Sequence, residues 1–494
     1  MKKMTLEPTT KSTTSAKVAL DDLLAGLCHT GKSNKEIANA FEALSLEDIE
    51  LIPHIDKFVN EINQRYCIVS LEGQTVILEE IVNTDDHIEV MFLKLNDFNL
   101  RMRNRYVIDR SGKSSHASQA WLGHPHRREH TRMVFEPNGA AANEYNLYQG
   151  LGVTPKAGDC LMLRQHILEN ICSGDSKIFD YLEAWVADIL LNPSHLPGIA
   201  VVLRGAEGVG KGIFGQALLK LFAPHSVHII QAMQVMGRFN GILKGILFAF
   251  LDESFWAGDK QFDGVLKGLI SEAEIVIEHK GKEPIRLSNY ARFLMASNSD
   301  WVVPAGNGAR RFLVLDVSDK RKADFVYFKA LTDHIKNGGL EAWAYDLVNF
   351  DCSGIELREV PKTKALFEQK LESLNSMQRY IYEILMDGNN CYAGSEGDWK
   401  PEISKANLYQ SYLDKAMAIG DKRRSDTMKF SSTVKKILGI SEDRTTIQGK
   451  RERVWCFPSL DICRQRFDKY MDATIDWPEI KNSRVSKKSK PSKF

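Results

Sequence analysis

The sequence predicts an α/β fold, because strand-like and helix-like segments alternate between residues 199 and 320. The stretch GIAVVLRG has the continuous apolar run of a buried strand and leads into the amphipathic stretch IFGQALLK. Two further apolar runs, ILFAFLDES and ARFLMASN, follow it. Between the first run and its helix lies GAEGVGK, whose spacing is that of a phosphate-binding loop. We therefore predict an α/β nucleotide-binding core.

Composition limits the class of protein. The chain has 494 residues, of which 43% are hydrophobic and 26% are charged, which indicates several soluble domains with real cores. Its net charge of +1 means that any nucleic-acid surface must be a local patch. The eight cysteines include no C-x-x-C pair, which favours reduced thiols over a zinc ribbon or a disulfide framework. Since no run of roughly eighteen apolar residues is present, we expect a cytoplasmic protein with no membrane partner.

Changes in periodicity and composition divide the chain into segments. The predicted segments are a flexible tail (1–17), a small α+β accessory or oligomerisation region (18–150), a helical segment (155–198), the α/β core (199–320), a helical region and linker (321–390), a winged-helix-like DNA-binding domain (402–470) and a basic tail (471–494). DNA binding by the penultimate segment is predicted because two helices and a hairpin there carry more Lys and Arg than acidic residues. A helical interaction module with a solvated basic face is the alternative.

The N-terminal region carries the weakest signals. Residues 18–65 show helical periodicity, and short strands are predicted over 67–107. A polymerising primase needs clustered acids, for which Asp85 and Asp86 are the only weak candidates. We interpret this region as an accessory or oligomerisation domain.

A loop-like stretch at 111–135 is rich in histidine. Its histidines are His116, His124, His126 and His130. The stretch has no cysteine and few carboxylates, so a metal-binding group and a basic loop without metal are both open interpretations.

The glycine-rich stretch after the first strand is the strongest motif. Gly205, Gly210 and Lys211 satisfy the spacing G-x-x-x-x-G-K, in which backbone amides and the lysine hold phosphates. The predicted nucleotide-binding residues are Gly205, Glu207, Gly208, Val209, Gly210, Lys211, Gly212 and Ile213. Gly212 stands where the usual motif has the Ser or Thr that ligates magnesium. Phosphate oxygens, waters and Asp252 can hold Mg²⁺ without it.

Polar residues end the next two predicted strands. Asp252 and Glu253 follow a strand, which predicts one carboxylate for Mg²⁺ and a second that polarises the attacking water. A solvated acidic turn is the alternative interpretation. Asn298 ends the third run, where an amide can lie between the γ-phosphate of ATP and the attacking water.

Two basic features complete the pattern. Arg310 and Arg311 precede another strand, where an arginine can stabilise the transferred phosphoryl group of a neighbouring subunit. The stretch EIVIEHKGKEPIRLSNY predicts a hairpin whose tip carries His279, Lys280 and Lys282. Such a tip contacts nucleic-acid phosphates if it lines a central channel, and otherwise it only adds surface charge.

The order of these motifs resembles the superfamily 3 helicases, which are AAA+ ring motors with a P-loop. The similarity extends over about 155–375 and is greatest to the helicase parts of phage and plasmid primase–helicases. The resemblance implies that Lys211 holds the β/γ-phosphates, that Asp252 and Glu253 serve metal and water, and that Asn298 is a sensor. It implies Arg311, or else Arg310, as the arginine finger. The hairpin lysines would then contact the translocated strand.

The implied protein is an ATP-dependent replicative DNA helicase of a phage, prophage or satellite element, which forms a ring, expected to be a hexamer. Single-stranded or forked DNA is the expected partner, other replication proteins are further candidates, and ATP and Mg²⁺ are the expected cofactors. Two alternatives stay open. One is a replication initiator or defence scaffold that uses ATP only for assembly, and the other is a primase–helicase.

Overall fold

The computed structural model describes residues 54–71, 73–83, 87–108, 113–252, 260–278, 284–303, 305–306, 309–391, 399–421, 424–447 and 450–479. These residues divide into two compact units. The first unit takes its residues from 1–152, 239–245 and 274–288, and the second from 153–238, 246–273 and 289–494. Two short pieces of the predicted α/β core therefore group with the N-terminal unit. No helix in the described ranges combines the length and the apolarity needed to cross a membrane.

The first unit contains a four-stranded sheet in the order β3-β2-β1-β6. Its strands pair antiparallel, except that β1 and β6 are parallel. The core beneath this sheet is apolar and includes the fully buried Val59, Phe98 and Trp121. The elements of the unit are α4 (His54–Asn63), β1 (Tyr66–Leu71), β2 (Gln74–Val82), β3 (Ile88–Leu93), α5 (Leu95–Arg101), β4 (Tyr106–Ile108), β5 (Ser114–His116), α6 (Ala117–Leu122), β6 (Glu129–His130), β7 (Arg132–Val134), β8 (Glu144–Asn146), the 3₁₀ turn η2 (Gly241–Leu243), β12 (Glu274–Ile277) and β13 (Ile285–Ser288).

The prediction of a loop over 111–135 is wrong, because most of the described residues in this range form β5, α6, β6 and β7. Long-range burial explains the difference. Trp121 on α6 is fully buried, with its ring centroid 5.2 Å from that of Phe98, and its Nε1 donates to Asn63 Oδ1 at 2.8 Å. Polar local composition cannot reveal an anchor of this kind.

The two strands that flank the predicted hairpin tip pair antiparallel, as expected. Asn240 holds the edge of this hairpin, because its Nδ2 donates to Val276 O and its Oδ1 accepts from Glu278 N, both at 2.9 Å. On the other strand of the hairpin, β13, Ser288 Oγ donates to Glu136 Oε1 at 3.0 Å. These contacts explain why the hairpin groups with the first unit.

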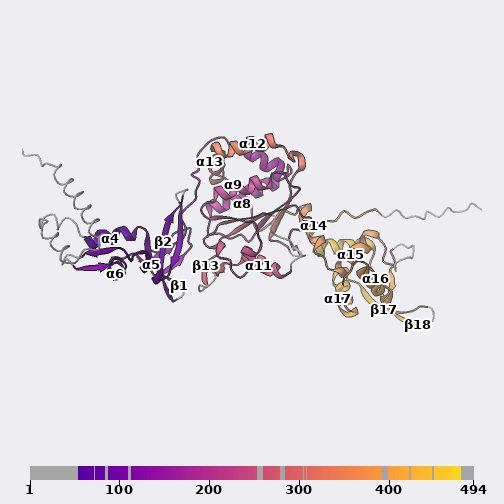
Figure 1. Ribbon diagram of the computed structural model, residues 1–494. Helices are drawn as coiled ribbons and strands as arrows, with labels where there is room; N and C mark the ends of the chain where they lie inside the picture. The colour runs from indigo at the N-terminus through magenta and orange to yellow at the C-terminus, as the bar shows by residue number, and fades with distance from the viewer. Residues whose placement is uncertain are drawn as a thin grey trace, which may run out of the picture. The chain divides into compact units, whose positions relative to one another are not determined.

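The second unit is built on a parallel five-stranded sheet in the order β10-β11-β14-β9-β15. Its central strands are nearly continuous apolar runs, as expected for a sheet covered on both faces. In Figure 1, α8, α9, α12 and α13 lie above the sheet and α11 lies below it. The close contact of α9 with β11 depends on Gly215, where a Cβ atom would approach the Phe250 ring to 2.5 Å.

The elements of this α/β part are α7 (Leu161–Gln165), the π-helix η1 (His166–Ile171), α8 (Ser176–Leu191), β9 (Ala200–Arg204), α9 (Lys211–Leu221), β10 (Ser226–Ile229), α10 (Met233–Met236), β11 (Phe248–Asp252), α11 (Lys260–Ser271), β14 (Arg292–Ser297), β15 (Phe312–Asp316), the 3₁₀ turn η3 (Asp319–Arg321), α12 (Phe325–His334), the π-helix η4 (Ile335–Gly339), α13 (Leu340–Val348) and α14 (Lys364–Glu372). The helical segment predicted over 155–198 contains α7 and α8, with the π-helix η1 between them. Single π-helical turns of this kind are often found at functional sites.

The C-terminal part of the second unit has the two helices and the hairpin in the predicted order. Its elements are α15 (Ser376–Asp387), β16 (Glu402–Ser404), α16 (Lys405–Ala418), α17 (Thr427–Leu438), β17 (Ser441–Ile447), β18 (Lys450–Cys456) and α18 (Leu460–Met471). The strands form an antiparallel sheet in the order β16-β18-β17. The core is wider than the range 402–470, because α15 contributes Ile381 and Leu385, and Ile475 packs from the other end.

Candidate functional site

The glycine-rich loop leaves the carboxyl end of β9 and ends where α9 begins at Lys211. Gly208 and Gly210 have φ angles of +75° and +99°, which only glycine adopts readily. At Gly210 a Cβ atom would also lie 2.7 Å from His166 Cε1 and 2.8 Å from Phe328 Cε1. Both the backbone angle and the packing therefore require glycine at this position.

Gly212 differs from Gly210, because no heavy atom lies within 4 Å of the position its Cβ would take. The position has room for the Ser or Thr of the usual motif. Its glycine is thus not required by packing.

Lys211 folds back over its own loop. Its Nζ donates to the carbonyl oxygens of Gly205 at 2.6 Å and Ala206 at 2.8 Å, and the residue is 7% exposed. An ammonium group in this position satisfies carbonyl groups and lies within the loop that surrounds it. It is close to any anion that the loop amides bind.

Two polar residues meet the loop at the same edge of the sheet. Asp252 is the last residue of β11, and Asn298 directly follows β14 and is exposed. The Asp252 carboxylate is half-buried, and its Oδ2 lies 3.6 Å from His228 Nε2 on β10. Since parallel strands end at one edge, these residues converge with the loop after β9. Glu253 lies outside the described residues.

The arginine pair lies at the opposite edge of the sheet. Arg310 and Arg311 precede β15, and the carbonyl oxygen of Arg311 accepts from Ala200 N at the start of β9 at 2.8 Å. Arg310 is exposed, whereas Arg311 is half-buried and its Nε donates to Ser271 Oγ at 3.4 Å. Neither is brought to the loop of its own chain.

The predicted DNA contacts His279, Lys280 and Lys282 lie outside the described residues. The two strands that lead to them belong to the first unit.

A buried polar layer beneath the loop went unnoticed in the sequence. Asn170 Nδ2 donates to Val209 O, and His166 Nδ1 is 3.3 Å from the Tyr327 hydroxyl. His166 is fully buried, and this burial lowers its pKa to about 4, with the nearby Arg321 acting in the same direction. The imidazole is therefore neutral near pH 7. Asn170 and His166 both belong to the π-helix η1, which no local sequence pattern predicted.

A second overlooked layer holds the chain after Asn298. Gln369 on α14 is fully buried, and its Oε1 accepts from Val302 N at 2.7 Å and from Val303 N at 3.1 Å. Its amide donates to Asp300 O. Arg204, one residue before the loop, forms an ion pair with Asp316 at 2.6 Å. The edge of the sheet is thus fixed on both sides of β9.

No three His, Cys, Asp or Glu side chains among the described residues are grouped as metal ligands. Of the predicted histidines, His124 contacts Asp56 at 3.1 Å, and His130 packs against Tyr145. Two glutamates in the same unit, the fully buried Glu79 and the partly buried Glu80, form ion pairs with arginine: Glu79 with Arg65 at 2.7 Å, and Glu80 with Arg128 at 2.8 Å. Asp85 and Asp86 lie outside the described residues.

The fold and the loop define the second unit as an α/β protein with a parallel sheet and a glycine-rich loop at its carboxyl edge. A family of unknown function (DUF5906) matches residues 203–311, which include this loop, β11 and β14. The matched range also includes Arg311 and the hairpin strands.

The chain is similar to a DNA primase–polymerase of Nitratiruptor phage NrS-1. The two are 24% identical over 229 residues, which cover 45% of this chain and 31% of the phage protein. The matched residues span about a third of that relative. A solved structure of the NrS-1 C-terminal region shares the fold, with a TM-score of 0.60 and 16% identity over 82% of this chain and 99% of the solved chain. A second structure of that region has a TM-score of 0.59 and 15% identity, over 81% of this chain and 98% of the solved chain.

Replacing the buried histidine should change how stability depends on pH. The pKa of His166 in the folded state is about 4, below its ordinary value of 6.5. The neutral imidazole therefore contributes fully to the free energy of unfolding above pH 6.5, and this contribution is lost as the pH falls through about 4. His166→Gln should therefore lose less stability over this range than the wild type, by about 3 kcal/mol. Chemical unfolding at pH 7, 5.5 and 4, followed by tryptophan fluorescence, measures the difference. Parallel pH curves for the two proteins would contradict it.

Proposed function

We propose that the chain is an ATP-dependent DNA motor of a phage-type replication protein, with a AAA+ P-loop core of the superfamily 3 type. One observation carries the proposal. The loop with Lys211, the strand ending at Asp252 and the strand followed by Asn298 are brought to one edge of one parallel sheet. Phosphoryl transfer needs a phosphate cradle, a metal-binding carboxylate and a group that positions water.

Each residue has a role that fits its environment. Lys211 exchanges its two carbonyl partners for the β/γ-phosphates of ATP. Asp252 presents a half-buried carboxylate, a donor that Mg²⁺ prefers, and bound Mg²⁺ would neutralise charge on the phosphates. Glu253 would polarise the attacking water, and Asn298 would orient it. Gly212 supplies no ligand.

Arg311 acts on a neighbouring subunit in this proposal. Because the strands are parallel, a residue before β15 lies at the edge opposite the loop after β9. An arginine there cannot complete its own site. It can reach the exposed loop edge of a second copy, which is why we propose a ring, expected to be a hexamer.

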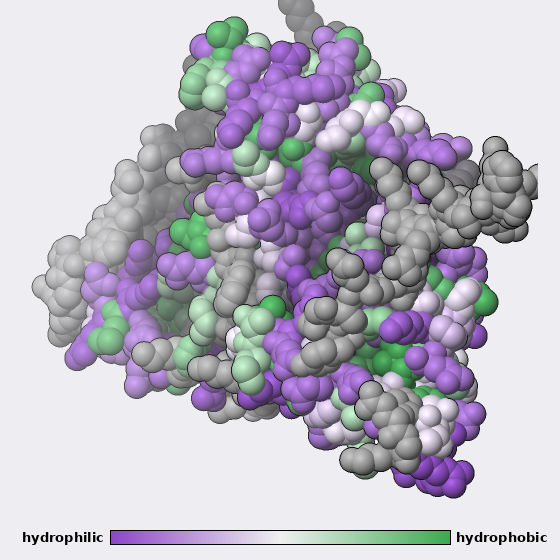
Figure 2. Space-filling view, turned by 90° about the vertical axis from the view of Figure 1, so that its right-hand side faces the viewer, coloured by the Kyte–Doolittle hydropathy of each residue, from purple (hydrophilic) through white to green (hydrophobic). Residues whose placement is uncertain are grey.

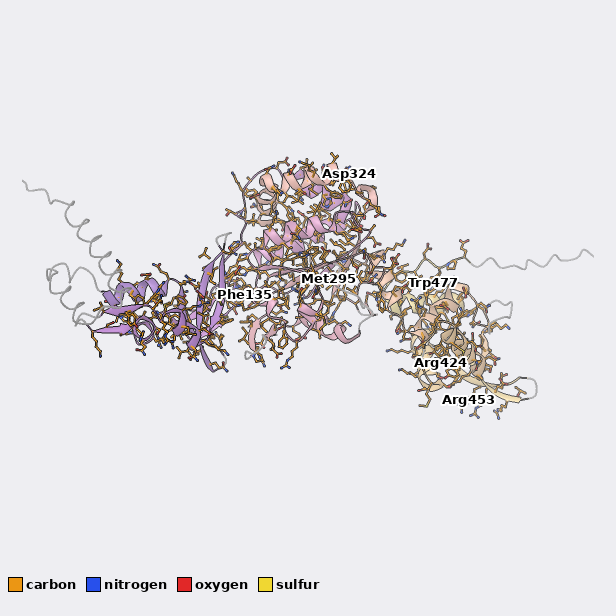
Figure 3. The ribbon with its side chains drawn as sticks, viewed as in Figure 1. Phe135, Met295, Asp324, Arg424, Arg453 and Trp477 are labelled. Carbon is orange, nitrogen blue, oxygen red and sulfur yellow. The ribbon has the colours of Figure 1, made fainter. Side chains whose placement is uncertain are left out.

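The C-terminal part offers a surface for duplex or forked DNA. Arg444 and Arg453 lie directly opposite each other on β17 and β18, and Arg451 is also exposed on this hairpin. Like charges in opposite positions destabilise a strand pair. Within the described part of the chain, none of the three has a carboxylate at ion-pair distance. DNA phosphates would offset this repulsion. Arg424, also exposed, belongs to the same part (Figure 3).

The visible face in Figure 2 is mostly hydrophilic, and its apolar residues form small separate patches. A partner that binds this face would therefore make more polar and charged contacts than large apolar ones.

A primase–helicase is the second candidate function, because the chain is similar to a phage DNA primase–polymerase. In the described part of the first unit, the carboxylates of Glu79 and Glu80 each form an ion pair with an arginine, which makes them poor metal ligands. Primer synthesis on single-stranded DNA, assayed with labelled nucleotides and Mg²⁺, tests this candidate directly.

ATP hydrolysis should require Lys211. Lys211→Ala removes the positive charge beside the phosphates, so turnover should fall to background, which means at least about a hundredfold. Glu253→Gln is the matched variant, because it should bind ATP but fail to hydrolyse it. Phosphate release and nucleotide binding separate the two effects. ATPase at the wild-type rate in Lys211→Ala would refute the assignment.

Mixing two inactive variants should restore activity if Arg311 acts across a subunit boundary. Arg311→Ala and Lys211→Ala each lack one half of the site, but a mixed ring contains some interfaces with both halves intact. ATPase of subunits mixed before assembly should recover partly, and Arg310→Ala serves as the control for the neighbouring arginine. Confirmed mixed rings without any recovery would place Arg311 outside the site.

The hairpin lysines separate a motor from an assembly scaffold. Lys280→Ala with Lys282→Ala removes two phosphate contacts, so the salt dependence of DNA binding should flatten. Stimulation of ATPase by DNA and strand separation should be lost, while basal ATPase survives. Normal unwinding by this double variant would leave the lysines as ordinary surface charge.

A further inference from the structure

We propose that Phe325 and Val326, at the start of α12, form a platform on which the base of the bound nucleotide stacks. The inference rests on the proposed function, because it requires that the loop after β9 binds the phosphates. It adds the part of the site that holds the base, and it predicts which nucleotides are accepted.

The strand order gives the direction in which the nucleotide lies. β14 and β11, which lead to Asn298 and Asp252, are on one side of β9, and β15 is on the other. The γ-phosphate must point toward the residues that act on it. The ribose and base therefore extend from the loop toward the side of β15, where the chain continues from Val317 into α12.

The segment after β15 touches the loop directly. Ala323 N donates to Gly208 O at 3.1 Å, and Phe328 packs where Gly210 lacks a side chain. Asp324, labelled in Figure 3, is the N-cap of α12. The first residues of α12 are thus held beside the phosphate cradle by contacts with the cradle itself.

Two large apolar side chains at this place are almost fully solvated. Phe325 is 81% exposed and Val326 is 82% exposed. Leaving both in water forgoes the stabilisation that burying their apolar surface would give. A flat apolar ligand beside the loop recovers part of it. The nucleobase is the part of ATP with that shape, and stacking on an aromatic ring is its usual mode of binding.

The polar groups nearby are already engaged. Asp324 Oδ1 accepts from Tyr327 N at 3.0 Å, and its Oδ2 accepts from Arg321 at 3.2 Å. The Arg321 guanidinium lies 4.3 Å above the Tyr327 ring. These contacts hold Asp324, Arg321 and Tyr327 against one another at the start of α12. The platform should therefore take adenine and guanine with similar affinity, since stacking does not depend on hydrogen bonds.

The test compares a nucleotide with a triphosphate that has no base. The full-length protein is titrated with ATP, GTP and inorganic tripolyphosphate, each with Mg²⁺, by calorimetry. Phe325→Ala should raise the Kd for ATP and for GTP by about fivefold or more, the loss of one stacking contact. The Kd for tripolyphosphate should not change. Met428→Ala, at a residue also 82% exposed but on α17, is the control and should change no Kd.

A second variant reports on contact without using activity. Phe325→Trp keeps an aromatic platform, so ATP should bind with wild-type affinity and quench the new fluorescence, whereas tripolyphosphate should not quench it. Unchanged ATP affinity in Phe325→Ala would overturn the inference, as would equal losses for ATP and tripolyphosphate. A change of oligomeric state with unaltered nucleotide binding would make Phe325 a subunit contact instead. Wild-type protein that binds none of the three ligands would refute the proposed function itself.

Discussion

Parallel pairing of β9 with β14 on one side and β15 on the other is the constraint on which the candidate site depends. Together with the parallel pairing of β11 with β14, it places the ends of β9, β11 and β14 at one edge, so Lys211, Asp252 and Asn298 converge although they are separated along the chain. The same pairing keeps Arg311 at the other edge. A single feature of backbone hydrogen bonding thus separates the residues proposed to act within one subunit from the one proposed to act between subunits.

The glycine-rich loop is held from below as well as from its ends. The π-helix η1 supplies Asn170 and the neutral His166, and α12 supplies Phe328. Glu207 and Gly208 of the loop stay exposed. A loop fixed in this way loses little conformational entropy when it binds an anion, which favours affinity.

Two neighbouring residues of α14 connect this edge of the sheet with the C-terminal part of the second unit. Gln369 on α14 holds the segment after Asn298, and the next residue, Lys370, donates to Met471 O at the end of α18 at 2.8 Å. One helix therefore contacts both the candidate site and the C-terminal part. The hairpin strands β12 and β13, by contrast, are fixed by Asn240 and Glu136 within the first unit.

Local patterns were enough to predict four strands of the α/β core (β9, β11, β14 and β15), the glycine-rich loop and the antiparallel pairing of β12 with β13, whereas β10 was missed. Apolar runs and glycine spacing are properties of a few neighbouring residues, so they can be recognised without the fold. The sequence also indicated Asp252 and Asn298 as strand-end residues. Their assignment to catalysis stays a prediction.

The supporting contacts were decided by tertiary structure alone. Asn170 and Val209 are 39 residues apart, and Trp121 and Asn63 are 58 apart, so neither pairing leaves a local signal. The same holds for α15, whose apolar face gave no indication that it packs into the C-terminal core. By itself the sequence determined the main strands and helices of the α/β core and where a loop suits phosphate, because these depend on neighbouring residues. Only the packed structure decided what holds that loop, which edge each charged residue occupies and which unit carries the hairpin, because these depend on contacts between distant residues.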